Sequence, residues 1–120
     1  MLSDISKALE ATGKPVYYGK APNVDGGEVW DYIVFFRTTL GLSTNKTGVT
    51  ERFTVAIVQE EYVETETINA VIEAMTGIPG VRLSNEDPEF DYAAKPNTDT
   101  VIEILTIGFV RPNKGVKVNV

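Results

Sequence analysis

Two long apolar segments with a polar stretch between them constrain the fold more than any other feature of this sequence. In residues 29–40, apolar side chains recur at even positions, namely at Trp30, Tyr32, Val34, Phe36 and Leu40. A period of two is typical of a half-buried strand, with these even positions on its apolar face. A second strand pattern covers residues 52–58, and the polar residues 41–51 between the two segments predict an antiparallel hairpin with a long tip.

Two amphipathic segments predict helices. Residues 3–12 and residues 66–76 both carry apolar side chains at the three- and four-residue spacing of one helix face. Ser3 and Thr65 are the expected N-caps, because hydroxyl side chains accept hydrogen bonds from the free amides of a first helical turn. A glycine and then a proline follow each segment and end it.

The order of elements predicts one α+β domain over residues 1–120. Shorter extended patterns cover residues 15–19, 81–83, 89–93 and 100–110. Together with the two helices and the hairpin, they predict an antiparallel sheet with both helices packed on one face. Residues 114–120 alternate valine with polar residues, a pattern that fits either an edge strand or a flexible tail.

The types of residue present exclude most catalytic chemistry. The 120-residue sequence contains no cysteine and no histidine. Without cysteine there are no disulfides, thiolate metal sites or cysteine nucleophiles, and without histidine the commonest catalytic triads and most zinc sites are excluded. We therefore expect no catalytic residue, no metal site and no cofactor, and hence no enzyme.

Charge and hydropathy narrow the expected partners. The net charge of −6 disfavours tight binding to nucleic acid, because that affinity comes from basic groups that displace counterions from phosphates. The sequence begins without a basic region followed by an apolar run, and no stretch approaches the ~20 apolar residues of a membrane span. We expect neither export nor a membrane partner.

Three motifs resemble binding sites but fail on spacing or context. Residues 13–20 look like a phosphate loop, but five residues rather than four separate the glycines, and Ala21 stands where a Ser or Thr should bind magnesium. The acidic run 85–91 lacks the alternating acids and central glycine of a calcium-binding loop, so a solvated loop is expected. Glu60 and Glu61 are adjacent on a strand and point to opposite faces, which does not make a catalytic pair.

The first long strand has more apolar residues than one packed face needs. Residues 33–36 are apolar on both faces, so the helices can cover one face and a neighbouring subunit part of the other. Ile33 and Phe35 are therefore candidate residues for an interface with another protein subunit. The polar tip is a second candidate, because loops on a rigid sheet are common recognition elements. Its candidate residues are Thr44, Asn45, Lys46 and Thr47.

Several short motifs occur in an order that resembles a known family. They are Val16-Tyr17-Tyr18-Gly19, Trp30-Asp31-Tyr32-Ile33-Val34-Phe35, Glu60-Glu61-Tyr62-Val63, Gly80-Val81-Arg82-Leu83, and Asp91-Tyr92-Ala93-Ala94-Lys95-Pro96-Asn97-Thr98 with Val101-Ile102-Glu103. Each motif alone is only an aromatic strand or a turn, but the ordered set covers nearly the whole chain. The set resembles the small tail-terminator, or tail-completion, proteins of tailed bacteriophages and related phage-tail-like particles.

The resemblance implies an α+β subunit that forms a ring, commonly a hexamer, which caps the finished tail tube and takes part in head-tail joining. The implied partners are further copies of the chain, the tail-tube protein and a neck or head-connector protein. The implied location is the tail or neck of the virion, after assembly in the host cytoplasm. DNA would pass through the ring without tight binding, because acidic side chains near a lumen repel phosphates over a Debye length of ~8 to 10 Å.

Two other interpretations stay open. Another neck component, such as a head-completion or minor capsid protein, shares the size and the context of a tail terminator. A small-ligand-binding or enzymatic α+β domain would use the carboxylates, although the missing histidines and the failed motifs count against it.

Overall fold

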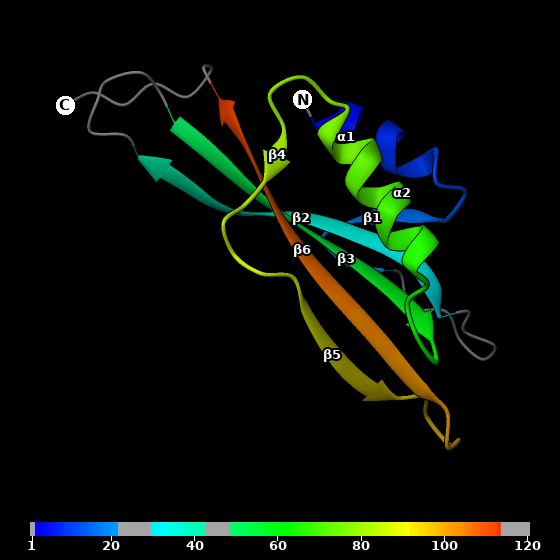
Figure 1. Cartoon of the computed structure of the whole chain (residues 1–120). Helices are drawn as coiled ribbons and strands as arrows, with labels where there is room; N and C mark the ends of the chain where they lie inside the picture. The colour runs from blue at the N-terminus through cyan, green and yellow to red at the C-terminus, as the bar shows by residue number, and fades with distance from the viewer. Residues whose placement is uncertain (1, 22–29, 43–48, 114–120) are drawn as a thin grey trace.

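The fold is a mostly antiparallel sheet with two helices on one of its faces (Figure 1). A computed structural model describes residues 2–21, 30–42 and 49–113. The described part confirms the predicted α+β class, the long hairpin and the placement of both helices on one face. Residues 114–120, for which the sequence left an edge strand or a tail open, lie outside the described residues.

Two helices and six strands make up the described chain. They are α1 (Leu2–Glu10), β1 (Val16–Tyr18), β2 (Asp31–Leu42), β3 (Val49–Glu60), α2 (Thr65–Thr76), β4 (Arg82–Leu83), β5 (Glu89–Ala94) and β6 (Val101–Asn113). Across the sheet the strands follow the order β1, β2, β3, β6, and both β4 and β5 pair with the far side of β6. All pairs are antiparallel except β1 with β2, which is parallel and was not expected from the sequence.

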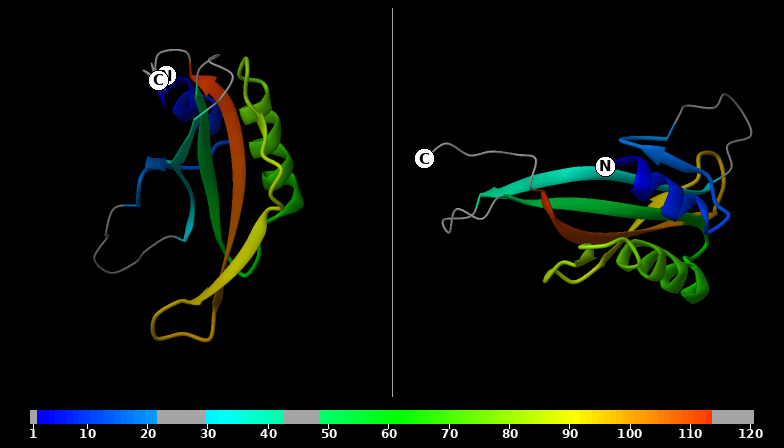
Figure 2. Two further views of the ribbon diagram at one scale, coloured as in Figure 1. Left: turned by 90° about the vertical axis from the view of Figure 1, so that its left-hand side faces the viewer. Right: turned by 90° about the horizontal axis from the view of Figure 1, so that it is seen from above.

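The three central strands make the molecule long and narrow (Figure 2). Its principal extents are 53 × 25 × 25 Å and its radius of gyration is 15.9 Å, against about 13.6 Å for a compact domain of this length. The elongation follows from strands of 12 and 13 residues, each about 40 Å long. Strands β2 and β3 continue into residues 41–42 and 49–51, which the sequence assigned to the tip, so the connection between them is residues 43–48.

The core lies between the helices and the odd-numbered side chains of the central strands. Its largest fully buried side chains include Phe35, Phe53 and Phe109 on the sheet and Leu9 and Met75 on the helices. The expectation that even positions of β2 form the principal apolar face was wrong. Residues 33–36 are apolar on both faces, so the sequence period alone could not decide which face meets the helices.

The helix starts also differ from expectation. Helix α1 begins at Leu2, which puts Ser3 inside the first turn, and the N-cap of α2 is Glu64, without a side-chain cap, rather than Thr65. Strand side chains accept hydrogen bonds from the chain just before α2 instead: Gln59 from the Glu64 amide at 3.0 Å and Glu103 from the Val63 amide at 2.8 Å. The sheet itself therefore fixes where α2 starts.

Candidate assembly site

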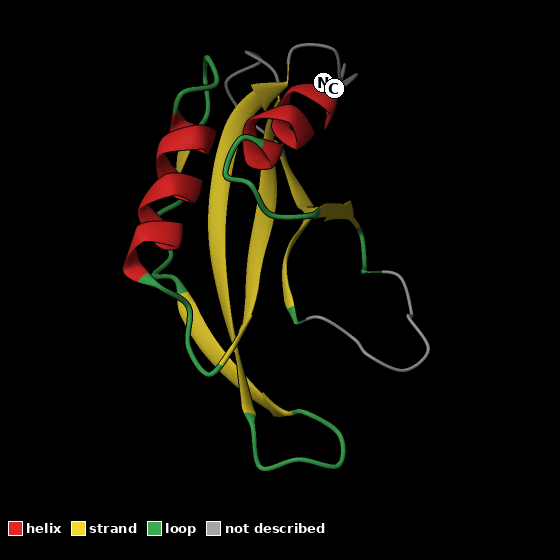
Figure 3. Ribbon diagram, turned by 90° about the vertical axis from the view of Figure 1, so that its right-hand side faces the viewer, coloured by secondary structure: helices red, strands yellow, loops and turns green. Residues whose placement is uncertain are grey.

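Strand β5 forms one open edge of the sheet. It pairs with β6 on one side, and no described strand pairs with its other side. All six of its residues are exposed. Phe90 and Tyr92 lie opposite Leu105 and Glu103 in the register, so both rings are on the helix side of the sheet, yet they are 49% and 63% exposed. Figure 3 shows why: β5 extends past the region that the helices cover.

The same edge is strongly acidic. Residues 86–94, which we call the acidic edge, contain Glu86, Asp87, Glu89 and Asp91 and no basic residue. The charge of Glu86 is partly neutralised by Arg52, which lies 3.6 Å away. In the described residues no group of three or more acidic side chains is placed to hold a metal ion. Residues 85–91, which the sequence assigned to a solvated loop, are exposed, and residues 89–91 belong to β5.

The second open edge belongs to the end of β2. Strand β1 pairs with residues 33–35 of β2, so the outer side of residues 36–42 has no partner strand in the described chain. We call residues 37–42 together with β1 the β2 edge. Its register shifts between Arg37 and Thr39, so Thr39 to Leu42 are the regularly paired part. Arg37, Thr38, Thr39 and Leu40 are all exposed.

The β2 edge also carries apolar side chains on the helix side of the sheet. Tyr18 lies opposite Phe35 and Leu40 opposite Glu51, and both of those partners face the helices. Tyr18 and Leu40 are nevertheless about half exposed. The Tyr18 ring packs edge-on against Phe35 at 5.1 Å between centroids, and its hydroxyl lies 3.4 Å from Arg37 Nε.

A buried ionic cluster holds the β2 edge to helix α1. The Glu51 carboxylate, 3% exposed, lies 3.5 Å from Arg37 and 3.8 Å from Arg111. Arg111 also donates to Asp4 at 3.1 Å and stacks over the Phe53 ring at 5.2 Å. Burial raises the pKa of the Asp4 carboxyl, but the charge and hydrogen bond of Arg111 outweigh it and hold that pKa below its ordinary value. The cluster makes α1, β3 and β6 one unit at this end.

A second buried carboxylate supports the acidic edge. Glu103 accepts hydrogen bonds from the Val63 amide and from the Tyr92 hydroxyl. The hydrogen bond to Glu103, burial and the nearby negative charge all raise the pKa of Tyr92, because each disfavours the phenolate. Nearby, Glu60 forms an ion pair with Lys95 at 2.5 Å rather than a carboxylate pair with Glu61. These contacts are structural, and they fix β5 against β6 and the start of α2.

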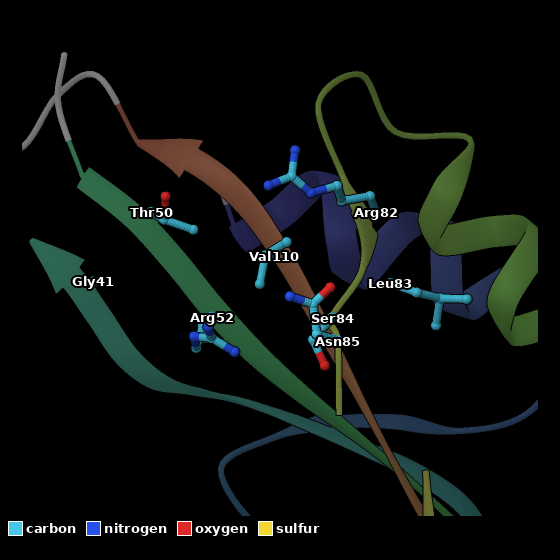
Figure 4. A pocket seen from close by; sticks show the side chains of 8 residues that line it. All are labelled: Gly41, Thr50, Arg52, Arg82, Leu83, Ser84, Asn85 and Val110. Atoms are coloured by element: carbon cyan, nitrogen blue, oxygen red, sulfur yellow. The ribbon is translucent and has the colours of Figure 1, made fainter. Parts of the chain in front are cut away.

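The face of the sheet away from the helices has a polar depression of about 290 Å³ (Figure 4). Its lining residues are Gly41, Thr50, Arg52, Arg82, Leu83, Ser84, Asn85 and Val110. A Cβ atom at Gly108 would lie 2.6 Å from the Ser84 hydroxyl, so the segment after β4 approaches β6 closely at this point. The guanidinium groups of Arg52 and Arg82 suit carboxylates, and Arg52 already lies 3.6 Å from Glu86.

The sequence-predicted interface residues lie in two places. Ile33 and Phe35 are 0% and 2% exposed in the subunit's own core, so they have no surface to offer a partner. Thr44, Asn45, Lys46 and Thr47 lie outside the described residues. The exposed rings of Phe90, Tyr92 and Tyr18 were not singled out, because an aromatic side chain on a strand is core by default, and Leu40 was assigned to the apolar face of its strand. Phe90 and Tyr92 alternate with acids, a pattern that a half-buried core strand shares.

Comparisons with known proteins leave the family open. No protein-family model and no curated protein matches the chain. Among solved structures, a chain described as "Virion of native gene transfer agent (GTA) particle" aligns over 93% of each chain with 14% identity and a TM-score of 0.46. An identity this low with a TM-score under 0.5 does not establish a shared function. No helix in the described ranges is long and apolar enough to cross a membrane.

Proposed function

We propose that the chain is a structural subunit of a phage or phage-tail-like particle that assembles into a ring, caps the tail tube, ends tube growth and provides the surface for head-tail joining. The family resemblance of the ordered motifs supports the tail-terminator role. The structural observation that carries self-assembly is the pair of open strand edges at opposite borders of one sheet.

Open edges support assembly for a physical reason. A strand edge presents unpaired amide and carbonyl groups, and monomeric proteins usually cover or shorten such edges. Two different open edges on one subunit allow a head-to-tail contact, which generates a ring when its rotation closes. A closed ring, commonly a hexamer in the family that the sequence resembles, leaves no subunit with a free edge.

The remaining parts of the proposal concern partners. The tip residues Thr44 to Thr47 are proposed to contact a neighbouring subunit or the tail-tube protein, and another face of the ring a neck or head-connector protein. The net charge of −6 fits a ring through which DNA passes without being bound. The subunit is proposed to act in the tail or neck of the virion, assembled in the host cytoplasm, without catalysis or a cofactor.

Two measurements test this proposal. Light scattering and electron microscopy of the purified chain, alone and with tail tubes, should show a closed ring on the tube end. A chain that stays monomeric in both conditions contradicts the proposal. Deleting the gene from a particle-producing genome should then give tails of uncontrolled length. Normal tails beside unjoined heads would instead indicate a head-side neck component.

A further inference from the structure

We infer that the acidic edge of one subunit pairs with the β2 edge of the next copy, so that the sheets of neighbouring subunits join into one continuous antiparallel sheet. This inference rests on the proposed self-assembly and names the contact that would produce it. The occupant of each edge is therefore a second copy of this chain.

Strand direction is the first argument. Strand β2 is antiparallel to β3, β3 is antiparallel to β6, and β6 is antiparallel to β5. Strands β2 and β5 of one subunit therefore run in opposite directions. A neighbouring copy with the same orientation places its β2 beside β5 as an antiparallel strand, the geometry in which inter-strand hydrogen bonds are straight.

The exposed apolar side chains are the second argument. Phe90 and Tyr92 at the acidic edge, and Tyr18 and Leu40 at the β2 edge, all lie on the helix side of the sheet. In a continuous sheet the four side chains would meet on one face at the junction. Burying exposed aromatic and aliphatic groups together removes their apolar surface from water, which favours the contact.

Charge is the third argument. Residues 86–94 carry four acids and no base, whereas the one charged residue of the β2 edge is Arg37, which is half exposed beside Glu51, and the exposed Lys20 follows β1 by two residues. A third cation near this edge, Lys14, is paired with Asp31 at 2.6 Å. Opposite charges favour contact between unlike edges, and like charges disfavour contact of the acidic edge with itself. The contact is therefore head-to-tail rather than two-fold symmetric.

The offset between the two edges is compatible with a ring. Strand β5 pairs with residues 101–106 of β6, whereas residues 39–42 of β2 lie level with its other end, through β3. The two edges are thus displaced along the strands by about 25 Å. Copies joined this way are staggered, and a closed ring requires the strands to tilt relative to the ring axis, as they do in closed barrels. The stagger also carries β1 of one copy past the end of the neighbour's β5.

The cysteine-free sequence allows a direct test. One tagged chain carries Phe90→Cys and a differently tagged chain carries Leu40→Cys, and the two are mixed at a concentration that gives assemblies, with tail tubes present if these are required. The mixture should give a reducible cross-link between the two tags about tenfold above the matched control mixture, because contact raises the effective thiol concentration. The matched control pairs Phe90→Cys with Glu73→Cys, since Glu73 is exposed on α2.

A second variant tests the charge argument. Glu89→Lys with Asp91→Lys should leave the melting temperature of the subunit unchanged and weaken assembly about tenfold, because the two edges then no longer carry opposite net charge. The control is Glu73→Lys, which should assemble normally. Rings that form without the Phe90–Leu40 cross-link would overturn the edge contact and leave the proposed function standing. A chain that forms no assembly, alone or on tubes, would contradict both.

Discussion

Arg111 donates a hydrogen bond to Asp4 at 3.1 Å, although 107 positions separate the two residues in the sequence. The contact joins the first helix to the last strand, and the same guanidinium lies beside the buried Glu51. Removing Arg111 therefore affects more than a surface pair.

Arg111→Met should lower the free energy of unfolding by about 2–4 kcal/mol, because it removes one of the two guanidinium groups beside the buried Glu51 carboxylate and leaves that charge with Arg37 at 3.5 Å and the Asn113 amide at 3.3 Å. Urea denaturation measures this change. The control is Asp4→Asn, whose loss should stay within about 1 kcal/mol, since the Asp4 side chain is 45% exposed and water screens its ion pair. Equal losses in the two variants would contradict the central position of Arg111.

The Asp4 carboxyl should also contribute to the loss of folding stability at acidic pH. Because its folded-state pKa lies below the ordinary value of 3.8, its contribution is present above that value and is lost as the pH falls through the lower folded pKa. Melting temperatures from pH 5 to pH 2 should fall less steeply for Asp4→Asn than for the unmodified chain. Parallel curves would show that Arg111 does not act on this carboxyl in solution.

Tyr92 should show the opposite dependence at alkaline pH. Its pKa is raised by the hydrogen bond to Glu103, so its contribution to stability is present below the unfolded pKa, about 10, and is lost as the pH rises through the folded pKa. Absorbance titration should therefore include a tyrosine step above the ordinary tyrosine pKa. Tyr92→Phe should remove that late step. An unchanged titration curve in Tyr92→Phe would contradict the assignment of this step to Tyr92.

The sequence predicted the helices better than it predicted the strand faces. Helix α2 starts within one residue of its predicted start, because the period of its apolar residues and the following Gly77 and Pro79 are local signals. The buried face of β2 could not be predicted, since residues 33–36 are apolar on both sides. Nor could the hydrogen bond from the Val63 amide to the Glu103 carboxylate, which joins residues 40 positions apart.

The candidate site was less predictable than the fold for a related reason. Whether an aromatic strand residue is core or surface depends on how far the helices extend over the sheet, which is a tertiary property. The pattern at Phe90 and Tyr92 is the same as that of a core strand, yet the helices do not cover this part of the sheet. Ile33 and Phe35 show the converse, since their apolar character serves the subunit's own core.

Helix α2 offers a matched pair of substitutions that tests its packing. Val71 is fully buried, whereas its neighbour Ile72 is partly buried at the margin of the core. Val71→Asp should cost more than about 4 kcal/mol and unfold the subunit, because it buries a charge without a partner. Ile72→Asp should cost about 1–3 kcal/mol, since its carboxylate can reach water. Circular dichroism melting measures both, and equal losses would mean that the helix is rotated from the described orientation.

The hairpin tip can be tested without disturbing the strands beside it. Leu42 and Val49 are the last register pair of β2 and β3, so a two-residue Asn-Gly turn can replace residues 43–48. Shortening the connection from six residues to two lowers the free-energy cost of closing the loop by about 1 kcal/mol. The melting temperature should therefore stay the same or rise slightly.

Assembly should respond differently if residues 43–48 contact a neighbouring subunit or the tail tube. The Asn-Gly variant should then form fewer rings and bind fewer tube ends, measured by light scattering and by counting capped tubes in electron micrographs. A second variant keeps the length but replaces residues 44–47 with glycine and serine, which separates the effect of side chains from that of reach. If only the short variant fails to assemble, the length of the connection matters and the side chains of residues 44–47 do not. If both variants assemble normally and support infectivity, the tip contacts no partner, and the sheet edges must account for assembly on their own.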